Sequence, residues 1–198
     1  VRQLSKAPID HLWFNNSEIP VILTVARFAK QKQLDVLIRA FAQVTNVIPA
    51  RLLILGDGSL RNELESLCQE LQIEQHVSLP GYDSNPYRFM SACDVFVLAS
   101  AWEGCPVALE EALACGSAVI VNDAPGGSKD IVEYGKYGIM IPYQDINALT
   151  EAIIKLLTNA ELKKHYQQQA LNRSEDFQYL NISKQYLDFS NSIASQKR

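Results

Sequence analysis

Short apolar runs of strand length alternate along this chain with segments in which apolar residues recur every three or four positions. The first run, over residues 20–26, is uncharged and rich in β-branched residues, as expected for a strand that is covered on both faces. Leu37, Phe41, Val44 and Ile48 follow at the spacing of one stripe of an amphipathic helix. Strands and helices that alternate in this order form a parallel sheet with helices on both faces.

This alternation extends over most of the chain. Six strands are expected, over 20–26, 52–55, 77–79, 95–98, 118–121 and 139–141. Helices are expected over 37–48, 60–71, 86–92, 106–115, 128–133, 145–157, 160–173 and 180–194, with a turn at Pro80-Gly81. The pattern predicts the α/β class: a Rossmann-like, three-layer domain with a six-stranded parallel sheet and additional C-terminal helices.

Composition and charge narrow the class of protein. The chain of 198 residues is 47% hydrophobic and 20% charged, which is typical of a soluble globular domain. Its net charge of -4 argues against a nucleic-acid partner, which usually selects a basic face. No apolar run reaches the roughly 18 residues that span a bilayer, so no transmembrane segment is expected.

The cysteines and histidines do not suggest a metal site. Cys68, Cys93, Cys105 and Cys115 match no metal-ligand spacing, and the three histidines are scattered. We therefore expect reduced thiols in a cytoplasmic protein and no bound metal.

The chemically unusual residues lie just after the expected strands. In a doubly wound sheet, ligands bind beyond the carboxyl ends of the strands, near the point where the strand order reverses. The segments at this edge are 27–32, 56–58, 81–82, 100–106 and 122–129. We expect the functional site among them.

The segment after the fourth expected strand has the features of an anion site. Gly104 lets the backbone approach a ligand closely, and Pro106 suits the first position of a helix. The N–H groups of Val107, Ala108 and Leu109 would then lack intrahelical partners and carry the positive end of the helix dipole. Such a helix start is suited to phosphate.

Two carboxylates flank this helix start. Glu103 lies on the loop before the helix, and Glu111 lies inside it. Carboxylates do not hold phosphate, but they accept hydrogen bonds from neutral hydroxyls. Sugar hydroxyls on both sides of a diphosphate fit this layout, and the alternative is that both groups are solvated surface carboxylates.

Two cations follow the first expected strand. Arg27 directly ends the strand, and Lys32 stands five residues later. Both could neutralise a diphosphate, the Arg as a fork of donors and the Lys as a point charge. A solvated position is the alternative, more so for Lys32 than for Arg27, because a charge beside a buried strand needs a partner.

Two glycine-containing segments lie at the same edge. Gly56-Asp57-Gly58 could suggest a dinucleotide fingerprint, but Arg61 stands where the third glycine should be. Gly126-Gly127 follows the fifth expected strand. Both segments can also be plain turns.

Taken in order, these residues resemble the C-terminal domain of family 4 retaining glycosyltransferases, which have the two-domain GT-B fold. The resemblance extends from Pro20 to Leu157. The matching features are, in chain order, Val25-Ala26-Arg27 with Lys32, Leu55 to Gly58 with Arg61, Gly81, Ala92 to Val97, Glu103 and Glu111, Ala112 to Gly116, and Gly138 to Pro142. Each feature alone is a weak signal, but the ordered set is specific.

The resemblance implies roles for four charged residues, which would form the catalytic set. Arg27 and Lys32 would bind the donor diphosphate. Glu111 would take the ribose hydroxyls, and Glu103 would contact the donor sugar.

The resemblance also implies a wider donor-binding surface, in which Tyr82 faces the base and backbone amides at the helix start help to hold the phosphates. These positions are Gly56, Asp57, Gly58, Tyr82, Gly104, Cys105, Pro106, Val107 and Ala108. The chain departs from the family pattern at Gln33, where Gly is usual, at Cys105, where an aromatic residue is common, and over 128–130.

The implied function is that of the donor-binding half of an enzyme that moves a sugar from a nucleoside-diphosphate sugar to an acceptor hydroxyl with retained configuration. UDP is preferred to GDP, and no separate cofactor is expected. Residues 1–19 would be a linker from a missing N-terminal domain, 20–158 the nucleotide-sugar-binding domain, and 159–198 C-terminal helices. The acceptor, a surface polysaccharide or glycolipid, would bind mostly through the missing domain, and the full-length protein would contact the inner face of the membrane peripherally.

Two other functions stay open. One is a domain that binds nucleotides or nucleotide sugars without catalysis. The other is a dinucleotide-dependent dehydrogenase, which Arg61 in place of a glycine disfavours. In the transferase interpretation, the isolated domain is expected to bind the donor weakly and to transfer no sugar.

Overall fold

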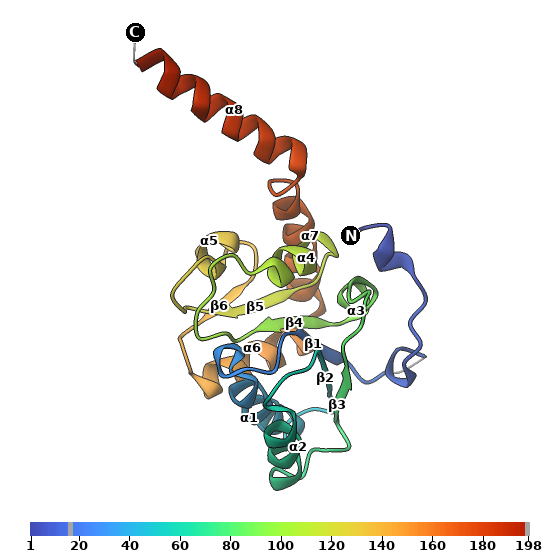
Figure 1. Ribbon diagram of the computed structural model, residues 1–198. Helices are drawn as coiled ribbons and strands as arrows, with labels where there is room; N and C mark the ends of the chain where they lie inside the picture. Colours follow the sequence, from blue (N-terminus) through green and yellow to red (C-terminus); the bar gives the residue numbers. More distant parts are fainter. Residues whose placement is uncertain (16–17, 197–198) are drawn as a thin grey trace.

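The computed structural model describes residues 1–15 and 18–196 (Figure 1). The strands in this part of the chain are β1 (Val21–Val25), β2 (Arg51–Leu55), β3 (Val77–Gly81), β4 (Val95–Leu98), β5 (Val119–Asn122) and β6 (Ile139–Ile141). The α-helices are α1 (Leu34–Thr45), α2 (Arg61–Glu70), α3 (Tyr87–Ala92), α4 (Val107–Ala114), α5 (Ser128–Ile131), α6 (Ile146–Thr158), α7 (Ala160–Ser174) and α8 (Tyr179–Gln196). Short 3-10 helices are η1 (Leu4–Lys6), η2 (Leu12–Phe14), η3 (Lys30–Lys32) and η4 (Glu133–Gly135).

The strands form one parallel sheet in the order β3-β2-β1-β4-β5-β6. β1 pairs with β2 along its whole length and with β4 on its other side. The strand order therefore reverses between β1 and β4. The predicted fold class, a Rossmann-like α/β domain with a six-stranded parallel sheet and further C-terminal helices, is confirmed.

All strands except β3 contribute side chains to two separate hydrophobic clusters, because successive residues of a strand point to opposite faces of the sheet, whereas β3 contributes only to the first. In β2, Leu52 and Ile54 belong to one cluster, and Leu53 and Leu55 belong to the other. Helices α1, α2 and α6 cover the first cluster, and α3, α4, α5 and part of α7 cover the second. Burial on both faces explains why the strands are uninterrupted apolar runs rather than alternating ones.

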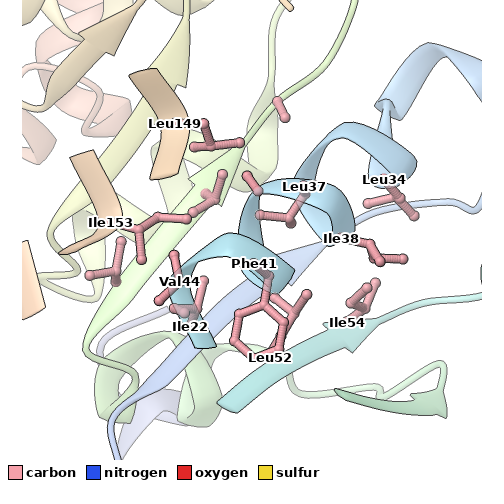
Figure 2. Close-up of a cluster of buried hydrophobic side chains, with 14 of the residues drawn as sticks. Ile22, Leu34, Leu37, Ile38, Phe41, Val44, Leu52, Ile54, Leu149 and Ile153 are labelled. Carbon is pink, nitrogen blue, oxygen red and sulfur yellow. The ribbon is translucent and has the colours of Figure 1, made fainter. Parts of the chain in front are cut away.

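The amphipathic stripe of α1 lies on the first of these clusters. Figure 2 shows Leu37, Phe41 and Val44 between the sheet and α6, where Leu149 and Ile153 meet them. The helix begins at Leu34 and ends at Thr45, three residues earlier at each end than the apolar spacing predicts.

Two local expectations are wrong. Pro80-Gly81 is the end of β3 rather than a turn, because the Gly56 N–H donates to the Gly81 carbonyl at 2.8 Å and extends the ladder beyond the apolar run. Pro106 is the N-cap of α4 rather than its first residue, with a non-helical ψ of 83°.

The two ends of the chain contact the domain differently. Residues 1–15 run along the second face of the sheet, where η1 packs against α3, and Ile9, Trp13 and Phe14 pack on the second cluster. Their origin in an interdomain linker stays a prediction. At the other end, α7 packs against α4 and α6, whereas α8 projects away from the sheet (Figure 1).

The helices of the domain include no candidate for a membrane span. Within residues 1–15 and 18–196, none is both long enough and apolar enough to cross a bilayer.

Candidate functional site

The loops that follow β1 and β4 lie side by side where the strand order reverses. The Ala101 N–H donates to the Gln31 carbonyl at 2.7 Å, and the Gln31 side-chain amide donates to the Trp102 carbonyl at 2.8 Å. These bonds join η3 to the loop after β4. In a doubly wound sheet this position, the topological switch point, is where ligands bind.

An ion pair connects the same two loops. Lys32 Nζ lies 2.6 Å from Glu103 Oε1, and the two side chains are 19% and 8% exposed. Two charges at this depth require each other, because either one alone would be left without compensation. The alternative that both residues are solvated surface charges is therefore wrong, although their contacts with a donor stay predictions.

Glu103 is held by its main chain as well as by its side chain. Its N–H donates to the Pro125 carbonyl at 3.1 Å, and its carbonyl accepts from the Gly127 N–H at 3.1 Å. Gly126 lies between these two bonds with φ +113°, and a Cβ there would stand 1.6 Å from the Glu103 carbonyl oxygen. Gly126-Gly127 is thus more than a plain turn, because only glycine lets the loop after β5 approach Glu103 this closely.

The start of α4 presents fewer free amides than expected. The Val107 N–H donates to the Cys105 carbonyl at 3.0 Å, and the Leu109 N–H donates to the Pro106 carbonyl at 2.8 Å. The expectation that both groups stay available to an anion is therefore wrong, because Pro106 caps the helix and the chain makes a tight first turn. Among the described residues, the Ala108 N–H has no acceptor, so it remains available to an anion.

The loop before α4 is open to solvent. Gly104 is exposed, and no atom lies within 4 Å of the position a Cβ would take. The exposed Cys105 thiol donates to Glu110 Oε1 at 3.2 Å, and this hydrogen bond raises the pKa of the thiol above its usual value. Cys105 is therefore mostly protonated at neutral pH.

Glu111 lies in α4, about one helical turn after Val107, and accepts a hydrogen bond from an aromatic hydroxyl. The Tyr87 hydroxyl donates to Glu111 Oε1 at 2.8 Å, and this bond raises the pKa of the Tyr87 hydroxyl above its ordinary value. Tyr82, which is 82% exposed, lies close enough to add to this shift. The structure thus joins the predicted ribose carboxylate to Tyr87, whereas the predicted base-facing Tyr82 is exposed.

Gly56-Asp57-Gly58 supports the loop after β1. A Cβ at Gly56 would stand 2.0 Å from the Ala26 carbonyl oxygen, and one at Gly58 would stand 2.5 Å from the Phe28 carbonyl oxygen. The two glycines therefore let the turn after β2 pack against the backbone on either side of Arg27.

Arg61, which disfavours a dinucleotide fingerprint, stabilises the same turn. Its guanidinium donates to Asp57 Oδ1 at 2.9 Å and to the Leu79 carbonyl at 3.0 Å. The hydrogen bond from Arg61 lowers the pKa of Asp57, and the Gly58 N–H adds to this effect. A dinucleotide-binding turn would have glycine at position 61. Here that position is an arginine whose hydrogen bonds stabilise the turn.

Arg27 is more solvated than Lys32, so the expectation that the charge directly beside the strand needs a protein partner is wrong. Its side chain is exposed, and in the part of the chain that the structure describes its guanidinium makes no ion pair or hydrogen bond. A cation left free at the switch point can receive an anionic ligand without first breaking an internal contact.

The contributions of Tyr87 and Gln31 to this site could not be read from the sequence, whereas Gly126-Gly127 was already expected at this edge. The Tyr87 hydroxyl donates to Glu111, and Gln31 joins the loops that follow β1 and β4. Gly126 lets the loop after β5 pack against Glu103. Of the three, only Gly126 carried a usable signal, as one of two consecutive glycines after a strand. The roles of Tyr87 and Gln31 depend on contacts across 24 and 71 residues.

The fold and the site together define the class of protein: a doubly wound α/β domain with charged side chains gathered at its switch point. Its sequence matches the family described as Glycosyl transferases group 1 over residues 10–173, and the chain belongs to this family. The resemblance to GT-B glycosyltransferases is thereby confirmed.

Individual proteins give the same result. The chain is 34% identical over 168 residues to a Campylobacter jejuni enzyme, N-acetylgalactosamine-N,N'-diacetylbacillosaminyl-diphospho-undecaprenol 4-alpha-N-acetylgalactosaminyltransferase, covering 85% of this chain and 46% of that one. Sucrose-phosphate synthase from Thermosynechococcus elongatus superposes with a TM-score of 0.81 at 26% identity, over 92% of this chain and 47% of its own. The Anabaena protein HepE, solved in complex with UDP, shares the fold with a TM-score of 0.81 at 23% identity, over 88% of this chain and 49% of its own. The chain thus spans about half the length of these relatives.

Proposed function

We propose that this chain is the donor-binding half of a retaining glycosyltransferase, which moves a sugar from a nucleoside-diphosphate sugar to an acceptor hydroxyl. The observation that carries the proposal is the Lys32–Glu103 pair at the switch point, because it sets a cation and a hydroxyl acceptor 2.6 Å apart. A diphosphate joined to a sugar presents both complementary groups close together: negative charge for Lys32 and hydroxyls for Glu103.

The chemistry asked of the site is stabilisation of the negative charge that builds on the leaving diphosphate. Arg27, Lys32 and the free Ala108 N–H are the groups that would supply it, and preorganised donors of this kind need no metal to act. When the diphosphate binds, Lys32 would be shared between a phosphate oxygen and Glu103. Glu103 would then accept a hydrogen bond from a sugar hydroxyl through its second oxygen.

We propose retention of configuration because the resemblance to family 4 glycosyltransferases implies it. We propose a front-face displacement in which the bond between the sugar carbon and the leaving phosphate oxygen breaks and the acceptor oxygen bonds to the same face of that carbon. The leaving phosphate oxygen takes the proton of the acceptor hydroxyl. The acceptor would be a polysaccharide or glycolipid bound largely outside these residues, at the cytoplasmic face of a membrane. The name of the Campylobacter jejuni relative, which refers to a sugar carried on diphospho-undecaprenol, supports a lipid-linked acceptor.

Thermal unfolding of the chain with UDP, GDP or NAD tests donor binding. A ligand at 100 times its Kd stabilises the folded state by about 2.7 kcal/mol, which raises the midpoint of a domain this size by roughly 5–10 °C. We expect UDP to raise the midpoint more than GDP and NAD to leave it unchanged. A shift with NAD alone would refute the proposal in favour of a dinucleotide-dependent enzyme.

Glu111→Gln tests the assignment of residues within the site. This variant should lose most of the UDP-dependent shift, whereas the matched control Glu151→Gln, at an exposed position on α6, should retain it. An equal shift in both variants would show that the ribose site lies elsewhere.

Catalysis is tested in the longer protein. Glu111→Ala should abolish sugar transfer there, and unchanged transfer would favour a nucleotide-sensing domain or a wrong assignment. The 198-residue chain alone should transfer no sugar, so activity from it would refute the half-site interpretation.

A further inference from the structure

Tyr87 makes a contact to which the proposed function assigns no role. It is the first residue of α3, and its hydroxyl donates to Glu111 Oε1 at 2.8 Å across 24 residues of sequence. Both side chains are partly buried, and the Tyr87 ring packs against the second hydrophobic cluster of the domain. The hydroxyl is therefore fixed in position by the core rather than by solvent contacts.

The start of α3 is itself held on several sides. Asp83 accepts from the Asn85 N–H at 2.7 Å and pairs with Arg88 at 2.6 Å, which closes the turn that leads into the helix. The Asn85 side chain reaches the Leu4 carbonyl at 2.9 Å. Because the backbone around Tyr87 is constrained in this way, the hydroxyl can hold a flexible partner.

Glu111 is such a partner. Its side chain has three rotatable bonds, and a group of this kind loses about 1.5–2 kcal/mol of conformational free energy when it is ordered. The bond from Tyr87 occupies Oε1, while Oε2 has no partner among the residues described. Glu111 also lines a surface cavity of about 330 Å³, together with Arg2, Glu110 and Phe177, so this residue is not sealed inside the fold.

We infer that Tyr87 is a positioning residue, which holds the Glu111 carboxylate so that its free oxygen receives the ribose hydroxyls of the donor nucleotide. This inference rests on the proposed function, in which Glu111 binds ribose. Tyr87 acts through Glu111 and does not touch the donor. It orders the carboxylate before the ligand arrives, so less conformational entropy is lost on binding.

A positioning role for Tyr87 predicts a specific change in ligand selectivity. If Tyr87 works only through Glu111, removing its hydroxyl should weaken binding of a ribonucleotide more than binding of a nucleotide that lacks the ribose hydroxyl. A residue that supports the fold or the base would weaken both ligands alike.

Isothermal titration calorimetry with UDP and 2′-deoxy-UDP tests this prediction. If GDP is the nucleotide that binds, the corresponding guanosine pair is used. Tyr87→Phe removes one oxygen and keeps the ring in the core. We expect UDP affinity to fall about five- to tenfold, as for one lost hydrogen bond, and 2′-deoxy-UDP affinity to change less than twofold. Tyr134→Phe is the matched control, because its hydroxyl also meets a carboxylate, Asp130, at 3.3 Å but outside the site.

One further variant leaves Tyr87 itself unchanged, and a double variant tests whether Tyr87 and Glu111 act together. Glu111→Asp keeps the charge but shortens the side chain by one methylene group, so it cannot reach both Tyr87 and the ribose. It should lose the preference for UDP over 2′-deoxy-UDP in the same way. In a Glu111→Gln background, Tyr87→Phe should have little additional effect, because the two residues act as one unit.

Parallel weakening of both nucleotides by Tyr87→Phe, or unchanged UDP affinity, would overturn the inference and leave the proposed function standing. Failure of the wild-type chain to bind either UDP or GDP would overturn the proposed function itself.

Discussion

Gly126→Ala should destabilise this protein through a single, localised contact. The new Cβ would lie 1.6 Å from the carbonyl oxygen of Glu103 and 2.7 Å from its carbonyl carbon, so the loop after β5 must move away. That movement breaks the two backbone hydrogen bonds of Glu103, to Pro125 and from Gly127. It also forces alanine into a backbone with φ +113°.

The size of the effect follows from these two causes. A non-glycine residue in a positive-φ region costs about 1–3 kcal/mol. Two backbone hydrogen bonds contribute about 1–3 kcal/mol more to the free energy of unfolding. Gly126→Ala should therefore cost roughly 2–6 kcal/mol, a large fraction of the stability of an ordinary domain.

Two other glycines separate these causes. Gly135 has φ +101° with no atom within 4 Å of the position that a Cβ would take, so Gly135→Ala carries the backbone strain alone. Gly104→Ala, on the same loop as Glu103, has neither a positive φ nor a close contact and should change stability by less than about 0.5 kcal/mol. The difference between Gly126→Ala and Gly135→Ala should thus be about 1–3 kcal/mol.

Urea denaturation followed by circular dichroism measures the free energy of unfolding, and amide hydrogen exchange reports the local change. In Gly126→Ala the Glu103 and Gly127 amides should lose protection, while in Gly135→Ala they should keep it. Equal destabilisation by both substitutions, with those amides still protected, would refute the reasoning.

Three further perturbations test other parts of the structure. Lys32→Met should destabilise the fold by about 3 kcal/mol because it leaves Glu103 buried without its partner, and adding Glu103→Gln should recover part of the loss in a double-mutant cycle by urea denaturation. Among the four cysteines, Cys105 should be the one that a thiol reagent labels in the folded protein, slowly at pH 7 and faster as pH rises, and Cys105→Ser should abolish this labelling. Burial lowers the pKa of His11, so the unfolded state binds more protons; stability should fall as pH drops below about 6.5, and His11→Phe should reduce that fall in thermal unfolding.

The order and type of the secondary structure could be read from the sequence because burial on both faces of a parallel sheet makes the central strands, such as β2 and β4, uninterrupted apolar runs. The runs ending at Val25 and Leu98 therefore marked β1 and β4, and the switch-point rule directed attention to the residues after them. Element ends were less certain, since β3 is extended by pairing with β2 and α4 is capped by Pro106, and neither effect leaves an apolar signature.

The sequence by itself determined which residue types stand at the carboxyl edge of the sheet: Arg27 and Lys32 after one strand, Glu103 and Glu111 after another. Tertiary structure alone decided their partners. It paired Lys32 with Glu103, left Arg27 without a partner among the described residues, and placed the Tyr87 hydroxyl on Glu111. The physical reason is that strand and helix patterns are local and repeat along the chain, whereas these contacts depend on strand order, which brings together loops that are about 70 residues apart.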